Sequence, residues 1–221
     1  MSLIQAMTTA TNRLRMLVSP GLLLSVLYLC GCATEVEVDG SFPPALTRQL
    51  ALSTTVVFDP AFANHRFEST EGPEVSIAVG QIQVELFTGL AASLFQHSSS
   101  ATEMPTKPEA DLILLPSVED VQISMPNESQ LNVFEVWIKY NLRVFNQAGE
   151  PIADWIMTAY GKTPTRFLKS NSDALHQAAM VAMRDAGAHF ITGFARVPEI
   201  QQWLLAHQAS RVSSTTEMAE P

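Results

Sequence analysis

The residues best suited to chemistry in this 221-residue chain are its two cysteines, Cys30 and Cys32, which are separated by a single glycine. A disulfide between them would close a small and strained ring. A redox pair usually has two residues between its cysteines, and a zinc site needs about four ligands, whereas the sequence has no further cysteine and no histidine nearby. The remaining interpretation is a processing signal in which only one of the two cysteines matters.

The residues before the cysteines favour the processing signal. Residues 1–16 carry Arg13 and Arg15 but no acid, and an apolar run over residues 17–29 follows. This run has the length of the hydrophobic region of a signal peptide and is shorter than the ~20 residues that a membrane-spanning helix needs. A basic start, a short apolar run and small residues after it are typical of a secretory signal.

The four residues Leu29-Cys30-Gly31-Cys32 resemble the lipobox of bacterial lipoproteins, in which an apolar residue, a small residue and Gly or Ala precede the cysteine that receives the lipid. The resemblance implies that Cys32 is acylated, and that Cys30 leaves with a signal peptide covering residues 1–31. Ala33 follows Cys32, which resembles the outer-membrane address of enteric lipoproteins and implies a position on the periplasmic face. The alternative is an ordinary buried apolar segment with incidental cysteines.

The charge of the chain excludes some partners. Once residues 1–31 are removed, 190 residues remain, which is enough for one domain with a hydrophobic core. Their 11 basic and 22 acidic residues give a formal net charge of −11. This acidic balance argues against nucleic-acid binding and against a basic patch on anionic lipid. We therefore expect membrane attachment to depend on acyl chains, of which several together hold stably.

The composition along the chain predicts its organisation. Residues 32–50 contain Gly40, Pro43 and Pro44 and are interpreted as a lipidated tether, although the alternating residues 35–39 could form a short edge strand. A single periplasmic domain is expected over residues 51–208. Residues 209–221 have no core pattern, so we expect a disordered tail there.

Hydrophobic periodicity predicts a mixed sheet and two main helices. Strands are expected over residues 50–60, over residues 111–126 in two parts separated by Pro116, and in a long hairpin made by residues 133–145 and 152–162. Helices are expected over residues 77–95, 172–194 and 198–207, and residues 97–110 are expected to form a loop. This order indicates an α/β or α+β fold, with a mixed sheet, a long antiparallel hairpin and two main helices packed on it.

The sequence contains no familiar catalytic or ligating pattern. Its five histidines form no i, i+4 pair and no His-Glu-x-x-His motif, and the chain has no nucleophile elbow, phosphate loop or dinucleotide fingerprint. We therefore expect a protein that is not an enzyme and that has neither a cofactor nor a metal site.

Three aromatic residues are candidates for a partner surface: Trp137, Phe145 and Trp155. Trp137 and Phe145 alternate with the apolar residues of the first hairpin strand and so lie on its other face, and Trp155 lies on the return strand. If the sheet is covered on both faces, these side chains are packed inside. Otherwise they form an exposed aromatic patch that binds a partner or a sister subunit.

The stretches LFTGLAASLF, ADLILLP and YNLRVFNQAGEPIADW resemble TolB amino-terminal-like and curli-secretion-lipoprotein-like α/β domains. This resemblance implies an oligomeric accessory of export, polysaccharide secretion or cell-wall assembly. The leading hypothesis is a non-enzymatic outer-membrane lipoprotein that scaffolds or assists an envelope complex, with envelope proteins or further copies of itself as partners. One alternative is a transport auxiliary lipoprotein that binds a small molecule or lipid between sheet and helix. Another is a hydrolase with an unrecognised site.

Overall fold

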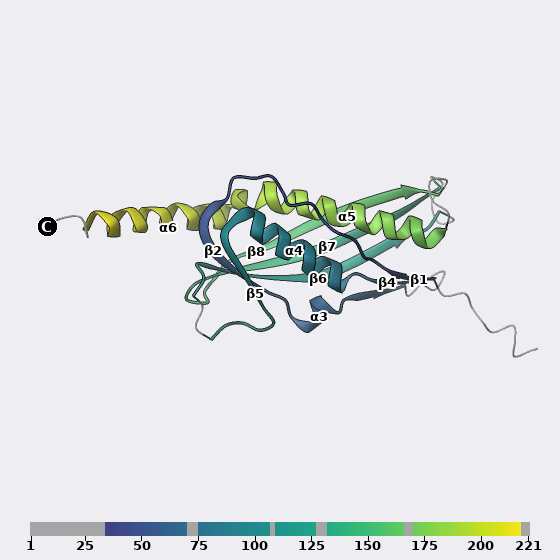
Figure 1. Cartoon of the computed structure of the whole chain (residues 1–221), viewed down its shortest axis with the longest axis horizontal. Coiled ribbons are helices and arrows are strands. Elements are labelled where there is room, and N and C mark those ends of the chain that lie inside the picture. The colour runs from purple at the N-terminus through teal and green to yellow at the C-terminus, as the bar shows by residue number, and fades with distance from the viewer. Residues whose placement is uncertain (1–33, 70–74, 107–108, 127–131, 166–169, 218–221) are drawn as a thin grey trace, which may run out of the picture. The chain divides into compact units, whose positions relative to one another are not determined.

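A five-stranded mixed sheet organises the part of the chain that the computed structural model describes, which is residues 34–69, 75–106, 109–126, 132–165 and 170–217 (Figure 1). The strands, in spatial order, are β5 (Phe95–Ala101), β2 (Leu50–Val57), β6 (Leu112–Ser124), β7 (Val133–Asn146) and β8 (Pro151–Pro164). Strand β2 is parallel to both of its neighbours, whereas β6, β7 and β8 are antiparallel. The predicted mixed α/β class is confirmed.

A second, smaller sheet forms near the start of the described chain. It consists of β1 (Thr34–Glu37), β4 (Val75–Ala78) and β3 (Arg66–Glu68), in the order β1-β4-β3, and the short helix α3 (Pro60–Ala63) lies between β2 and β3 in the sequence. Strand β1 falls inside the predicted tether, and so the edge-strand alternative for this segment is confirmed. The rest of the segment also lies on the domain, because Val38 is buried and its N–H donates to the Ala78 carbonyl over 3.0 Å.

The predicted long hairpin is confirmed. Strands β7 and β8 pair in one register from Val133 opposite Pro164 to Val144 opposite Ala153. Asn146 starts the turn, and its side-chain oxygen accepts hydrogen bonds from the N–H groups of Ala148 and Glu150, each over 2.9 Å. The apolar face of β7 is buried, which agrees with the alternation in the sequence.

Strand β6 is a single strand of 13 residues, and the prediction of two strands separated by Pro116 is wrong. Proline cannot donate to a neighbouring strand, and it is tolerated where one edge has no partner. Pairing with β2 ends at Leu114, so Pro116 lies beyond the paired edge while it still faces Leu142 of β7. A bulge at Glu119 shifts the register further along.

The prediction of a loop over residues 97–110 is wrong for its first residues, which belong to strand β5. Its residues from Gln96 to Ser100 are all exposed, so they show no alternation of apolar and polar side chains. Backbone pairing with the parallel strand β2 holds β5 at the edge of the sheet, and the hydroxyls of Thr55 and Ser99 lie 3.0 Å apart. Since hydrophobic periodicity reports burial, it could not detect this strand.

The two predicted main helices are α4 (Gly80–Leu94) and α5 (Asn171–Gly193), and both pack on the same face of the sheet (Figure 1). Helix α4 begins three residues later than predicted, because residues 75–78 belong to β4. The side chain of Ser170 caps α5 by accepting a hydrogen bond from the N–H of Asp173 over 3.0 Å. A buried polar chain crosses the core: the Tyr140 hydroxyl donates to Gln83, whose amide donates to the Phe62 carbonyl.

The C-terminal helix α6 (Pro198–Glu217) follows a short 3-10 turn, η2 (Phe194–Arg196), and extends away from the sheet (Figure 1). Helix α6 therefore includes residues 209–217 of the segment 209–221 that the sequence predicts as a tail. Several residues of α6 contact the domain: Ile200 is fully buried, Trp203 and Leu204 pack on the core, and the Arg211 guanidinium reaches the Ala51 carbonyl. The later residues carry no apolar stripe, so the sequence offered no sign of a helix there.

Helix α5 approaches β8 closely along a row of buried alanines: Ala174, Ala178, Ala182 and Ala186. Gly161 of β8 lies beneath this row. A Cβ atom at Gly161 would lie 2.0 Å from the Ala178 carbonyl oxygen and 2.3 Å from the Ala182 backbone nitrogen. These are backbone atoms of α5, which cannot move aside easily, so only glycine fits at this crossing.

We expect Gly161→Ala to lower the free energy of unfolding by about 1–3 kcal/mol, the usual cost of overpacking a core. Urea denaturation would measure the loss. The matched control is Gly89→Ala in α4, where an added Cβ meets nothing within 4 Å and should raise stability by about 0.5–1 kcal/mol. Equal effects of the two substitutions would contradict the close approach of α5 and β8.

Candidate functional site

The segment of residues 38–49, here called the strap, crosses from α5 to α4 and is held at both ends. At the first end, Nε2 of His176 lies 2.9 Å from the Asp39 carbonyl oxygen and 3.0 Å from its carboxylate. At the second end, the Ala45 N–H donates to the Ser93 hydroxyl over 3.1 Å, and the Gln49 amide donates to the Ala92 carbonyl over 3.1 Å. The strap starts only six residues after Cys32.

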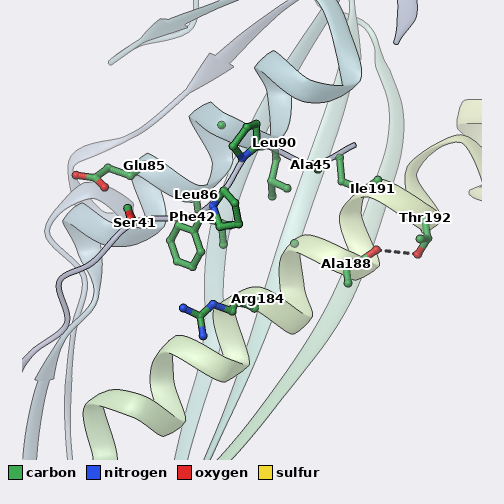
Figure 2. A pocket seen from close by; sticks show the side chains of 14 residues that line it. Ser41, Phe42, Ala45, Glu85, Leu86, Leu90, Arg184, Ala188, Ile191 and Thr192 are labelled. Carbon is green, nitrogen blue, oxygen red and sulfur yellow. Dashed lines mark hydrogen bonds between the residues drawn. The ribbon is translucent and has the colours of Figure 1, made fainter. Parts of the chain in front are cut away.

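Beneath the strap, α4 and α5 enclose a groove of about 380 Å³ (Figure 2). Its lining is mainly apolar and includes Phe42, Pro44, Leu86, Leu90, Gly187 and Ile191. The volume is at the lower end of the range of about 300–1,000 Å³ that is usual for small-molecule sites. The groove is open because Gly89 has no side chain, and a Cβ there would meet nothing within 4 Å.

Few polar groups reach the groove, and one of them is already engaged. The Thr192 hydroxyl donates to the Ala188 carbonyl over 2.7 Å, a bond that Figure 2 shows within α5. Glu85 of α4 and Arg184 of α5 both line the groove, and in Figure 2 the Glu85 carboxylate points away from Phe42, whereas Arg184 projects on the side of Phe42. Among the described residues, the Arg184 guanidinium has no hydrogen bond or ion pair.

The groove differs from the pocket that the sequence suggested. A pocket between sheet and helix was the basis of the lipid-binding alternative, but that interface is filled by one continuous core. The groove lies instead on the outer side of the helices, between α4, α5 and the strap. The strap lies within residues 32–50, which the sequence predicts as a tether. Its two consecutive prolines, Pro43 and Pro44, are the sequence feature that indicates the strap, since they favour an extended segment.

The aromatic residues predicted as one partner surface lie at separate places. Trp137 lies on the face of the sheet that the helices leave uncovered, where it is 37% exposed, with its ring 4.9 Å from that of Tyr160. Phe145 is on the same face but is half-buried against a small cluster with Ile113. Trp155 is on the opposite face, where its ring stacks on Phe190 of α5. A role in partner binding stays a prediction for all three.

A tyrosine–glutamate pair reinforces the uncovered face. The Tyr160 hydroxyl donates to the Glu135 carboxylate over 2.5 Å. Ionisation of the phenol would break this bond and place two negative charges together, so the hydrogen bond to Glu135 raises the pKa of Tyr160 to about 12. The phenol therefore remains a neutral donor at physiological pH.

Side chains of α5 cover the outer edge of β8, the last strand of the sheet. The Tyr160 N–H donates to the Asp185 carboxylate over 3.0 Å, and Nδ1 of His189 lies 2.9 Å from the Thr158 carbonyl oxygen. An exposed strand edge is a template for pairing with other chains. These two contacts use groups of that edge that would otherwise be free to pair.

A second polar cluster fastens α6 to the sheet. The backbone N–H and the hydroxyl of Ser53 both donate to the Asp111 carboxylate over 2.7 Å, and Nε2 of His207 lies 3.7 Å from its other oxygen. The Arg211 guanidinium donates to the Ala51 carbonyl over 3.0 Å. The sequence could not predict this cluster, because its members come from distant parts of the chain.

The charges and hydrogen bonds of this cluster change the pKa of Asp111. Burial alone would raise the pKa of Asp111, but the hydrogen bonds from Ser53 and the nearby His207 and Arg211 outweigh it and hold the pKa below its ordinary value. The Ser53 hydroxyl donates to the Asp111 carboxylate and accepts a hydrogen bond from the Asp111 N–H over 3.0 Å, so it joins β2 to the residue that precedes β6.

Neither a metal centre nor a membrane span is found in the described ranges. Within them, no group of three or more His, Cys, Asp or Glu side chains could hold a metal ion. No helix in the same part of the chain is long and apolar enough to cross a membrane. Cys32 and the predicted signal peptide of residues 1–31 lie outside the described residues.

Comparison with known proteins shows only distant similarity. No protein-family model matches the sequence, and no curated protein matches it. A Xanthomonas campestris crystal structure assigned to the family DUF330 matches with 11% identity and a TM-score of 0.48, covering 81% of this chain and 96% of that one. A minor lipoprotein from Acinetobacter baumannii matches with 10% identity and a TM-score of 0.39, covering 66% and 91%. A lipoprotein from Neisseria meningitidis matches with 16% identity and a TM-score of 0.30, covering 62% and 98%.

The lowered pKa of Asp111 makes a prediction about pH. A carboxyl whose pKa is lower in the folded state contributes stability above its ordinary pKa of 3.8, and this contribution is lost as the pH falls through the folded value. We expect Asp111→Asn to lower the free energy of unfolding by about 1 kcal/mol at pH 7. The difference from wild type should shrink below pH 4 in urea denaturation. Asp154→Asn, at an exposed position of β8, is the control and should show neither effect.

Proposed function

We propose that this chain is a lipid-anchored protein of the bacterial envelope, acylated at Cys32 and held at the periplasmic face of the outer membrane. Its domain then acts as a non-enzymatic accessory or scaffold of an envelope assembly or export complex. The observation that carries the proposal is the position of Cys32, which follows a basic and an apolar region and precedes β1 by two residues. Because β1 and the strap pack on the domain, the anchor would hold the domain close to the membrane surface.

The uncovered face of the sheet supports the accessory role. Trp137 and Ile156 are exposed there, at 37% and 43%, among charged side chains such as Lys139 and Arg143. Aromatic and arginine side chains are common at protein interfaces. This face is the surface that we assign to a partner protein or to a further copy of the chain.

The groove favours a second candidate function, that of a transport auxiliary lipoprotein which binds an apolar ligand. The supporting observation is the open volume between two helices whose facing side chains are mainly apolar. A lipid anchor and a ligand groove are compatible, since the strap that roofs the groove continues directly from the anchored end of the chain.

We expect wild-type protein to begin at Cys32, to carry added acyl mass and to appear in the outer-membrane fraction. Cys32→Ala should abolish both the added mass and the membrane association, because it removes the thiol that accepts the lipid. Cys30→Ala is the matched control and should behave as wild type, since a small residue is kept within the lipobox. Intact mass spectrometry and membrane fractionation are the measurements. Identical behaviour of all three proteins would exclude the anchor.

A further inference from the structure

The shape of the groove limits the kinds of ligand that can bind in it. The strap is tied to α5 near Asp39 and to α4 at Ala45 and Gln49, so it bridges the groove and closes its outer side. A peptide helix is about 10–12 Å across and would need the strap to detach. A volume of about 380 Å³ suits a slim, flexible and unbranched chain that can lie beneath the strap.

The chemistry of the groove indicates the headgroup. Leu86, Leu90 and Ile191 present only apolar groups to an occupant, and the Thr192 hydroxyl is already bonded within α5. The one cation at the rim is Arg184, which is exposed and has no partner in the described part of the chain. A guanidinium binds a carboxylate or a phosphate through two parallel hydrogen bonds.

We infer that the groove binds a single-chain lipid with an anionic headgroup, whose chain lies between α4 and α5 beneath the strap and whose headgroup pairs with Arg184. A long-chain fatty acid is the simplest member of this class. The inference rests on the second candidate function proposed above, since it names the ligand of the same groove. It needs no displacement of the strap and no rearrangement of the core.

Calorimetric titration of the full-length chain with dodecanoate and with dodecan-1-ol distinguishes the contribution of the headgroup to the affinity from that of the acyl chain. The chain carries Cys32→Ala in every sample, so that no attached acyl group competes. We expect Arg184→Gln to weaken dodecanoate binding at least tenfold, because the charge-assisted hydrogen bonds of the guanidinium are lost, and to leave dodecanol binding unchanged. Arg143→Gln is the matched control, because Arg143 is exposed on the uncovered face of the sheet and should change neither affinity.

A second variant tests the location of the acyl chain. Gly89→Leu fills the open space in the groove and should weaken both ligands at least tenfold, while it keeps the urea midpoint at or above that of the parent chain. If this variant binds both ligands as tightly as the parent, the site lies elsewhere and the inference is wrong.

The outcomes distinguish the two levels of the proposal. If the parent chain binds neither ligand, the groove does not take an apolar chain, and the second candidate function fails with the inference. A different result is that both ligands bind to the parent chain, that Gly89→Leu abolishes binding of both, and that Arg184→Gln changes neither affinity. The groove is then an apolar site, and only the anionic headgroup is excluded. Native mass spectrometry of protein extracted from membranes gives an independent check. A retained single-chain lipid supports the inference, and a retained polypeptide overturns it.

Discussion

The close contact between α5 and β8 is the constraint on which the rest of this structure depends. Gly161 faces a row of alanines, and the helix backbone lies where any larger side chain would have to be. At that distance α5 can occupy only one height and one rotation above the sheet. Every other side chain of the helix is then directed in a defined way, because residues three or four positions apart share a face.

Two consequences follow on the two flanks of α5. On the flank at the sheet edge, Asp185 and His189 reach the backbone of β8 and block its free hydrogen-bonding groups. On the opposite flank, Arg184 and Ile191 face α4 across the groove. The two helices meet through Gly187, which lies against Leu86 and Leu90, and they leave open volume where Gly89 has no side chain. Small residues thus have two effects: Gly161 and the alanines of α5 allow dense packing on the sheet, and Gly89 leaves open volume between the helices.

The strap connects this groove to the start of the chain. Its residues leave β1, cross both helices and enter β2, so the segment next to the proposed lipid anchor is also the roof of the proposed ligand site. At the other end of the chain, Asp111 joins Ser53 of β2 to His207 of α6. The strap therefore leads directly into the first residue of β2, and residues within β2 contact α6 directly or through Asp111. Segments from both ends of the domain thus contact the same strand.

The sequence by itself determined the features that depend on local patterns. The alternation in residues 133–145 and the turn at Asn146 specified the hairpin, because side chains of a strand point to opposite faces in turn. The apolar residues of α4 and α5 recur at helical spacing, and the residues before Cys32 indicated a lipidation signal in the same local way. For segments without such patterns, only the tertiary structure decided whether they pack on the domain and where they lie. Strand β5, the strap and residues 201–211 of α6 have few buried side chains, so hydrogen bonds to distant residues help to fix their positions. The groove with Arg184 and the cluster around Asp111 exist only because folding brings together residues from distant parts of the chain, such as Ser53 and Asp111, which are 58 positions apart. No spacing along the chain records that.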